Sequence, residues 1–234
     1  MIKPFDTAEP VRLFIRQTAG PVIVNAGEPG TSIVEIAGPN ENDYNVSLKD
    51  GLLTVEAPKS LILFALRETT ITVTVPAGST VDISVGAGRV ELVGAFGKGI
   101  VKTGAGDVNI DQAAGNTKVQ TGAGSIRLGK VNAPTQASLG AGNITVGDVA
   151  ANLDVAFGPG VFKVGRISRG NLTAKGTAGD MTIGVAPGVP TWTDLHTIGR
   201  ISSTLPPVGT PAEGQDHIEL RLTTAVGSIT LLPA

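Results

Sequence analysis

A tripeptide, GAG, recurs at a fixed interval of 18 residues and limits the folds open to this chain more than any other feature. Its copies, including one GPG variant, begin at Gly86, Gly104, Gly122, Gly140 and Gly158. Altered copies follow at Gly176 (GTAG), Thr197–Arg200 (TIGR) and Ala225–Ser228 (AVGS). Equal spacing of this kind indicates a repeat architecture, in which each unit buries its apolar side by stacking on the next.

Apolar residues occupy the same two positions after the last glycine of each copy. The first column reads Val90, Val108, Ile126, Ile144, Phe162, Met181, Ile201 and Ile229. The second reads Leu92, Ile110, Leu128, Val146, Val164, Ile183, Ser203 and Leu231. The residue between the two columns is mostly polar, and this period of two is typical of a half-buried strand. The glycines mark sharp turns that directly precede these strands.

These columns predict an all-β fold, a single-stranded parallel β-solenoid with 18-residue coils. A left-handed hexapeptide helix also has 18 residues per turn, but it needs an aliphatic residue at every sixth position. Asp107, six residues after Val101, breaks that rule. We therefore expect a right-handed or flattened β-helix.

The first third of the chain is rich in strand patterns but lacks the 18-residue phase, and terminal units of such folds are normally atypical. We expect an irregular β-rich N-terminal cap over residues 1–79, with a separate small sandwich as the alternative. The solenoid then covers residues 80–234. Proline- and glycine-rich sequence at about 187–216 predicts loops inserted into its last coils.

Charge and composition narrow the classes of function. The net charge is −2, but residues 89–175 carry ten basic and five acidic side chains. The chain has no cysteine, which excludes disulfides and thiolate chemistry. Its densest apolar stretch, Leu61–Leu66, is too short to span a bilayer, so we expect no membrane insertion. The N-terminal segment lacks the apolar run of a signal peptide, and we expect a cytoplasmic protein.

The glycine-cornered coils, the segment TVTVPAGSTVDISVGAGRV and the C-terminal sequence from Asp194 to Ala234 together resemble a known family. This is the bacterial "putative adhesin" family of β-strand-repeat proteins, a domain of unknown function common in actinobacteria. The resemblance covers nearly the whole chain. Members usually have TGSGD at the corner, where this chain has GAG with an aspartate only at Asp107 and Asp180. The resemblance implies the β-solenoid fold and supplies no catalytic or binding residues.

Three patterns in the sequence could indicate a metal or ligand site, and each has a simpler structural interpretation. Calcium between coils needs acidic residues in successive corners, whereas only Asp107 and Asp180 are acidic, so we expect Asp107 to cap a turn. His196 and His217, with Asp194 and Asp216 nearby, lack a third spaced ligand for a metal. We expect Trp192 to pack against the solenoid flank. We therefore assign no catalytic, cofactor-binding or metal residues and expect no cofactor.

The leading interpretation is a non-enzymatic scaffold or protein-interaction protein. The alternative is a surface adhesin or a carbohydrate-binding or carbohydrate-processing β-helix, which would need carboxylates gathered in a groove. The candidates are Glu91, Asp107, Asp111, Asp148 and Asp154. The basic side chains lack interleaved aromatic residues, so we do not expect nucleic acid as a partner. A basic middle segment could still dock an anionic partner. The expected partners are a second copy, joined as a dimer through the C-terminal coils with Leu232 at the edge, or another protein.

Overall fold

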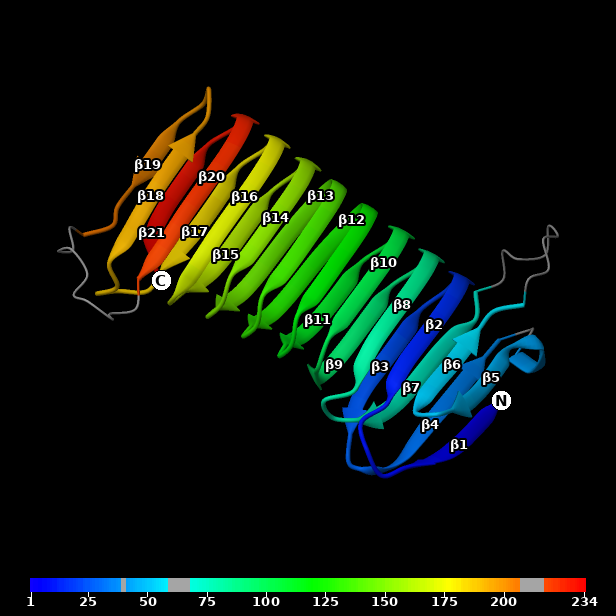
Figure 1. Cartoon of the computed structure of the whole chain (residues 1–234). Helices are drawn as coiled ribbons and strands as arrows, with labels where there is room; N and C mark the ends of the chain where they lie inside the picture. Colours follow the sequence, from blue (N-terminus) through cyan, green and yellow to red (C-terminus); the bar gives the residue numbers. More distant parts are fainter. Residues whose placement is uncertain (39–40, 59–67, 207–216) are drawn as a thin grey trace.

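The structure is a computed structural model that describes residues 1–38, 41–58, 68–206 and 217–234, so the apolar stretch Leu61–Leu66 lies outside the described residues. It is all-β, as predicted (Figure 1). Its one helix among the described residues is the short 3₁₀ helix η1 (Glu41–Asp43). No helix in this part of the chain is long and apolar enough to cross a membrane.

The strands form two opposite sides of an elongated stack, which we call face A and face B. Face A contains β2 (Arg12–Ala19), β8 (Thr80–Ala87), β10 (Gly99–Ala105), β14 (Leu153–Pro159), β16 (Gly170–Ala178), β18 (Thr191–His196) and β20 (Ile218–Val226). Face B contains β3 (Val22–Gly27), β9 (Val90–Phe96), β11 (Val108–Ala113), β15 (Phe162–Ile167), β17 (Met181–Val185), β19 (Ile201–Ser203) and β21 (Ile229–Pro233). Two long strands, β12 (Thr117–Val131) and β13 (Thr135–Val149), bend at their glycines and contribute to both faces.

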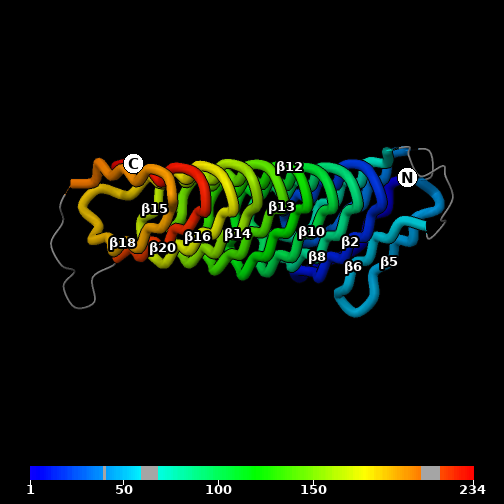
Figure 2. The backbone as a smooth tube through the Cα atoms, turned by 90° about the horizontal axis from the view of Figure 1, so that it is seen from above, coloured from blue at the N-terminus to red at the C-terminus, as the bar shows by residue number. Residues whose placement is uncertain are grey.

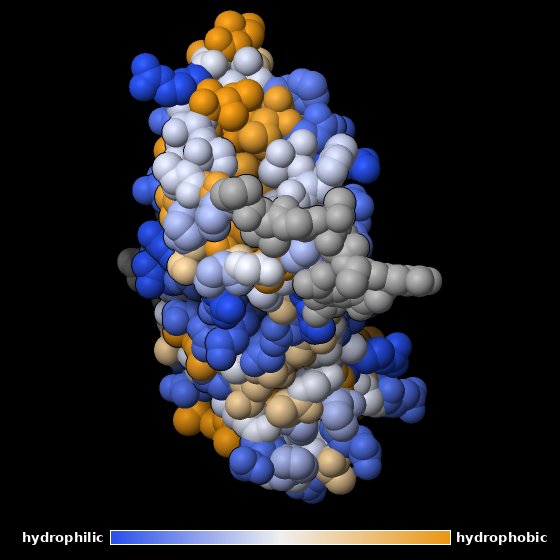
Figure 3. Space-filling view, turned by 90° about the vertical axis from the view of Figure 1, so that its left-hand side faces the viewer, coloured by the Kyte–Doolittle hydropathy of each residue, from blue (hydrophilic) through white to orange (hydrophobic). Residues whose placement is uncertain are grey.

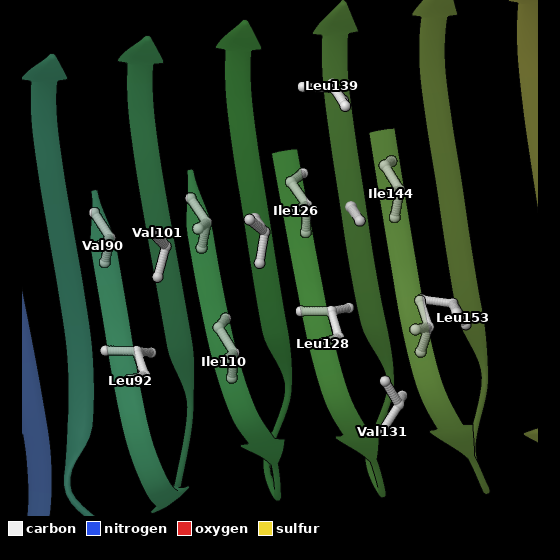
Figure 4. Packing of buried hydrophobic residues seen from close by; sticks show 14 of the residues in the cluster. Val90, Leu92, Val101, Ile110, Ile126, Leu128, Val131, Leu139, Ile144 and Leu153 are labelled. Carbon is white, nitrogen blue, oxygen red and sulfur yellow. The ribbon is translucent and has the colours of Figure 1, made fainter. Parts of the chain in front are cut away.

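The apolar columns read from the sequence are confirmed by the strand register. Val108 lies between Val90 and Ile126 in parallel strands, and Ile144 lies between Ile126 and Phe162. These side chains point inward and are fully buried, so each 18-residue unit lays its apolar residues directly on those of its neighbour (Figure 4). One continuous apolar core results, and it runs from Val11 to Leu231.

The corner glycines are required by both backbone conformation and space. Gly106 has φ +136°, a value that residues with a Cβ rarely adopt. A Cβ on Gly106 would lie 2.0 Å from the carbonyl oxygen of Gly88, and one on Gly124 would lie 2.2 Å from that of Gly106. Each corner therefore stacks so closely on the previous corner that only glycine fits.

The prediction of a purely parallel β-solenoid is wrong, because the sheet is mixed. In the N-terminal third, β1 (Ile2–Thr7) pairs antiparallel with β4 (Gly30–Ala37), and β4 pairs antiparallel with β7 (Thr70–Pro76). The strands β5 (Asn45–Lys49) and β6 (Leu52–Glu56) form an antiparallel hairpin through a turn at Asp50 and Gly51.

One part of this difference, the β5–β6 hairpin, has a local cause. A two-residue turn with positive φ reverses the chain and favours antiparallel pairing, whereas an 18-residue unit returns the chain in the same direction. The described part of the N-terminal third has one such turn, at Asp50 and Gly51, and no 18-residue phase, while β1, β4 and β7 pair antiparallel through longer connections. Face A and face B join at the corners, so the sheet nearly closes around its core into a barrel-like shape (Figure 2).

The strands at both ends of the stack do not follow chain order. At the C-terminal end, β20 lies between β16 and β18, and β21 lies between β17 and β19. At the other end, β2 lies between β6 and β8. The strands β18 and β19 fall within the segment predicted as loops. At the C-terminal end β18 and β19 precede in sequence the strands β20 and β21 that separate them from the stack, whereas at the N-terminal end β6 and β7 follow the strands β2 and β3 that separate them from β8 and β9.

A buried polar cluster closes the N-terminal end of the core. The Tyr44 hydroxyl donates a hydrogen bond to Oε1 of Gln17 at 2.8 Å, and Nε2 of Gln17 donates to the carbonyl oxygens of Ala19 and Thr69. Tyr44 and Gln17 are both buried. Burial raises the pKa of Tyr44 above its ordinary value because the phenolate is poorly solvated there, although a hydrogen bond with the Thr69 side chain acts in the opposite direction.

Tyr44→Phe is expected to lower the free energy of unfolding by about 1 kcal/mol near neutral pH, because it leaves Oε1 of Gln17 without its donor. The advantage of the parent protein should then shrink above pH about 10. There the unfolded tyrosine ionises while the folded one, with its raised pKa, stays protonated, so stability is lost as the pH rises. Denaturant titrations of both proteins at neutral and alkaline pH measure this. A difference that does not change with pH would contradict it.

Candidate interaction surfaces

The corner polar residues hold the backbone together, and Asp107 has a structural role as expected, although it binds the amide of the next corner rather than its own turn. Oδ1 of Asp107 accepts a hydrogen bond from the Ser125 amide at 2.9 Å. In the same way Asn143 accepts from the Val161 amide, and Asp180 accepts from the Ser228 amide. A carboxylate or amide oxygen in every second corner thus satisfies the amide of the next corner in the stack. The alternation of Asp107, Asn143 and Asp180 in the sequence was the signal for it.

The histidines lie on face A near the C-terminal end but in separate pairs. Nε2 of His196 lies 2.7 Å from Oδ1 of Asp194, and Nε2 of His217 lies 3.9 Å from Oε1 of Glu219. Asp216 lies outside the described residues. Within the described part of the chain, the structure brings no three histidine, cysteine or acidic side chains together as a metal site.

The five carboxylates of the coils are not brought together either. Glu91 and Asp148 are on the outward side of face B, and Asp154 is on the outward side of face A. Asp107 is engaged at the corner, and Oδ2 of Asp111 accepts a hydrogen bond from the Gly94 amide at 3.2 Å. The acid–base groove that a carbohydrate-processing β-helix would need is not formed by these residues.

The C-terminal end of the stack presents two strand edges. Among the described strands, β18 pairs only with β20, and β19 pairs only with β21. Leu232, the residue expected at the edge, instead lies opposite Gly184, with β19 between its strand and the end of the stack. The edge expected at the last strand in the sequence is therefore formed by β18 and β19.

Apolar side chains gather at this end. Ile201 belongs to the core column but is 46% exposed, because no described strand lies beyond β19, and Ile198 at the adjacent corner is 87% exposed. A separate small cavity of about 80 Å³ lies at the other end of the face B strands, lined mainly by Val185, Ala186, Pro187, Val189, Leu205 and Pro233. Figure 3 looks onto the C-terminal end of the stack and shows apolar residues gathered over its upper part. Among the described residues, Val189, Leu195 and Leu205 cover part of the core at this end, and Ile201 stays exposed.

Trp192 projects outward from β18 and is 53% exposed, and its contact with the flank is with Arg221 of the neighbouring strand β20. The guanidinium of Arg221 lies 5.6 Å from the centre of its ring, a cation–π contact, and Arg221 is also 3.6 Å from Glu219. These contacts hold the indole upright at the edge of face A, where it adds to the exposed apolar surface of the end.

Face B carries a different surface, a basic patch made of Arg127, Lys130, Lys163 and Arg166. All four side chains are exposed and belong to the basic middle of the sequence. Thr145 lies between Arg127 and Lys163 in the register, and Asp148 lies between Lys130 and Arg166. The patch is therefore two rows of cations that cross the strands.

A long mixed sheet nearly closed around a repeat core defines an all-β repeat protein. The chain belongs to the Toastrack DUF4097 family, whose model matches residues 12–190. This match confirms the resemblance to a bacterial family of β-repeat proteins of unknown function. No curated protein matches the sequence.

Several crystal structures resemble the chain over nearly its whole length. A "putative adhesin" from Bacteroides fragilis NCTC 9343 aligns with 14% identity and a TM-score of 0.43, covering 99% of this chain and 96% of that chain. A "putative lipid binding protein" from Parabacteroides distasonis ATCC 8503 has 11% identity, a TM-score of 0.41 and the same coverage. A "putative cell adhesion protein" from Clostridium sporogenes ATCC 15579 has 14% identity, a TM-score of 0.31 and coverage of 99% and 97%. At these values none of them transfers a function to this chain.

Proposed function

We propose that this chain is an interaction protein rather than an enzyme, and that it binds a second copy of itself through its C-terminal end. The observation that carries the proposal is the C-terminal end of the stack, where Ile198, Ile201 and Trp192 are exposed beside two strand edges. Exposed strand edges next to apolar surface favour pairing with another chain, because pairing satisfies backbone groups and buries apolar area together.

The two ends of the stack differ, which favours a dimer over a filament. At the N-terminal end Tyr44 is buried over the core, and Val46 and Leu48 pack against it. The N-terminal amine also forms an ion pair with Glu41 at 2.9 Å. Among the described residues, the C-terminal end is the one where an apolar residue of the repeat's core columns, Ile201, is exposed. A contact between two C-terminal ends related by a two-fold axis uses this surface of both copies. No free copy of the surface then remains to add a third chain, so the assembly stops at a dimer.

Two-fold symmetry also sets the direction of pairing. A two-fold axis perpendicular to the stack reverses the strand direction across the contact, so the edge strands of the two copies pair antiparallel. Such pairs need no crossover connection between the chains. The exposed Ile198 and Ile201 of each copy would then be buried at the centre of a continuous core.

The double variant Ile198→Lys/Ile201→Lys is expected to convert a dimer into a monomer, because it places four like charges in the contact of two copies. Light scattering coupled to gel filtration measures the mass of each protein. The matched control is Ile2→Lys/Ile33→Lys, which makes the same exchange at two exposed isoleucines near the other end. It should remain dimeric. A monomeric parent protein at high concentration, or a dimer disrupted equally by both variants, would refute the proposal.

A further inference from the structure

The basic patch on face B is a second surface, independent of the C-terminal end. Its four cations, Arg127, Lys130, Lys163 and Arg166, have no ion pair with any described residue, although Asp148 stands between two of them in the register. Four cations on a rigid sheet outnumber the neighbouring carboxylates of Asp148 and Asp111, and this excess of positive charge attracts anions. The chain as a whole is weakly acidic, so this potential is local to the patch.

Bare backbone separates the two rows of cations. Gly129, Gly147 and Gly165 lie between the rows, and all three are exposed. A Cβ at these positions would come within 2.4, 2.5 and 2.9 Å of the preceding carbonyl oxygen in the stack, so the packing of the strands requires glycine here. The result is a smooth strip along the stack axis, flanked on both sides by long basic side chains.

The spacing of the cations indicates an extended ligand. Arg127 and Lys163 are two units apart, as are Lys130 and Arg166. Neighbouring parallel strands are about 4.8 Å apart, so the charges in each row recur at about 10 Å. This is roughly the length of two sugar rings, the interval at which an acidic polysaccharide with one charge per disaccharide presents its anions.

The neutral residues of the patch also suit a sugar chain. Thr145 lies between two of the cations, and Thr182 continues the same row in the neighbouring unit. Hydroxyl groups of this kind can exchange hydrogen bonds with sugar hydroxyls. No large apolar side chain of the patch is available for insertion into a lipid interface, and no aromatic ring is available for stacking of bases.

We propose that face B binds an acidic polysaccharide, which lies along the strip over Gly129, Gly147 and Gly165 with its anionic groups between the two rows of cations. This goes beyond the proposed self-association and uses different residues. Binding should weaken steeply with salt, because each neutralised anion releases counterions.

The test compares dextran sulfate with uncharged dextran, which share a backbone and differ in charge. The parent protein should bind only dextran sulfate. Arg127→Gln/Lys163→Gln is expected to weaken binding by about tenfold or more and to reduce its salt dependence. The matched control, Lys102→Gln/Lys175→Gln, removes two exposed charges from face A and should change affinity less than about twofold, since it leaves the patch intact.

Equal losses in the two variants would overturn the proposal, because they would mean that only net charge matters. Tighter binding to anionic lipid vesicles or to single-stranded DNA than to dextran sulfate would overturn it in favour of those ligands. Repeating the titration on Ile198→Lys/Ile201→Lys separates the two surfaces. In this variant, adding Arg127→Gln/Lys163→Gln should still weaken the binding of dextran sulfate, whether or not the parent protein is a dimer.

Discussion

Gly106→Ala is expected to lower the free energy of unfolding by more than about 4 kcal/mol, enough to leave little folded protein. The added Cβ would lie 2.0 Å from the carbonyl oxygen of Gly88, and the residue has φ +136°. The contact cannot relax locally, because Gly88 and Gly124 sit in the same ladder of corners. Circular dichroism during denaturant titration measures the loss.

Gly30→Ala is the matched control for this prediction. Gly30 has φ +119°, but a Cβ there would meet nothing within 4 Å. Its cost should be limited to the backbone strain of about 1–2 kcal/mol. Similar losses in the two variants would mean that the corner tolerates a side chain and that its stacking is looser than described.

Val108→Asp is expected to unfold the protein, because it buries a carboxylate without a partner. Val108 is fully buried between Val90 and Ile126, where neither neighbour can donate a hydrogen bond from its side chain. An uncompensated buried charge costs about 3–5 kcal/mol. The loss should appear as a lower melting temperature or as insoluble protein.

Thr145→Asp serves as its control, since it introduces the same carboxylate on the outward side of face B. Thr145 is exposed and lies between Arg127 and Lys163, so the new charge should be tolerated. A stable Val108→Asp protein would place this strand in the opposite register. An unstable Thr145→Asp protein would contradict the outward assignment of that row.

Much of the core and its corners could be predicted from the sequence, because each unit repeats the same local requirement. Gly106 must turn, Val108 must point inward, and the residue between two inward positions must face water. Stacking of identical units then brings like residues into register, as Val108 and Ile126 show. The structural role of Asp107 followed from the same reasoning, since its column lacks the successive carboxylates that calcium needs.

The candidate interaction surfaces could be predicted from the sequence only in part. The basic middle of the sequence was visible as a charge difference, but its concentration on face B in two rows depends on which strands the structure places side by side. The sequence around Trp192 does not indicate that its side chain is exposed. Whether a tryptophan in a strand is buried depends on which elements pack against that strand, and the local sequence does not show this. Leu232 was placed at the edge only because it comes last in the chain.

What the sequence determined by itself was the 18-residue period, the glycine corners and the inward columns, since these depend on interactions between equivalent positions of neighbouring units. Only the tertiary structure decided the antiparallel N-terminal pairs, the insertion of β2–β3 and β20–β21 between other strands, and the exposure of Ile201 at the C-terminal end. The physical reason is that the backbone edges of parallel strands are nearly equivalent. The chain's choice among them rests on long-range packing, which no local pattern records.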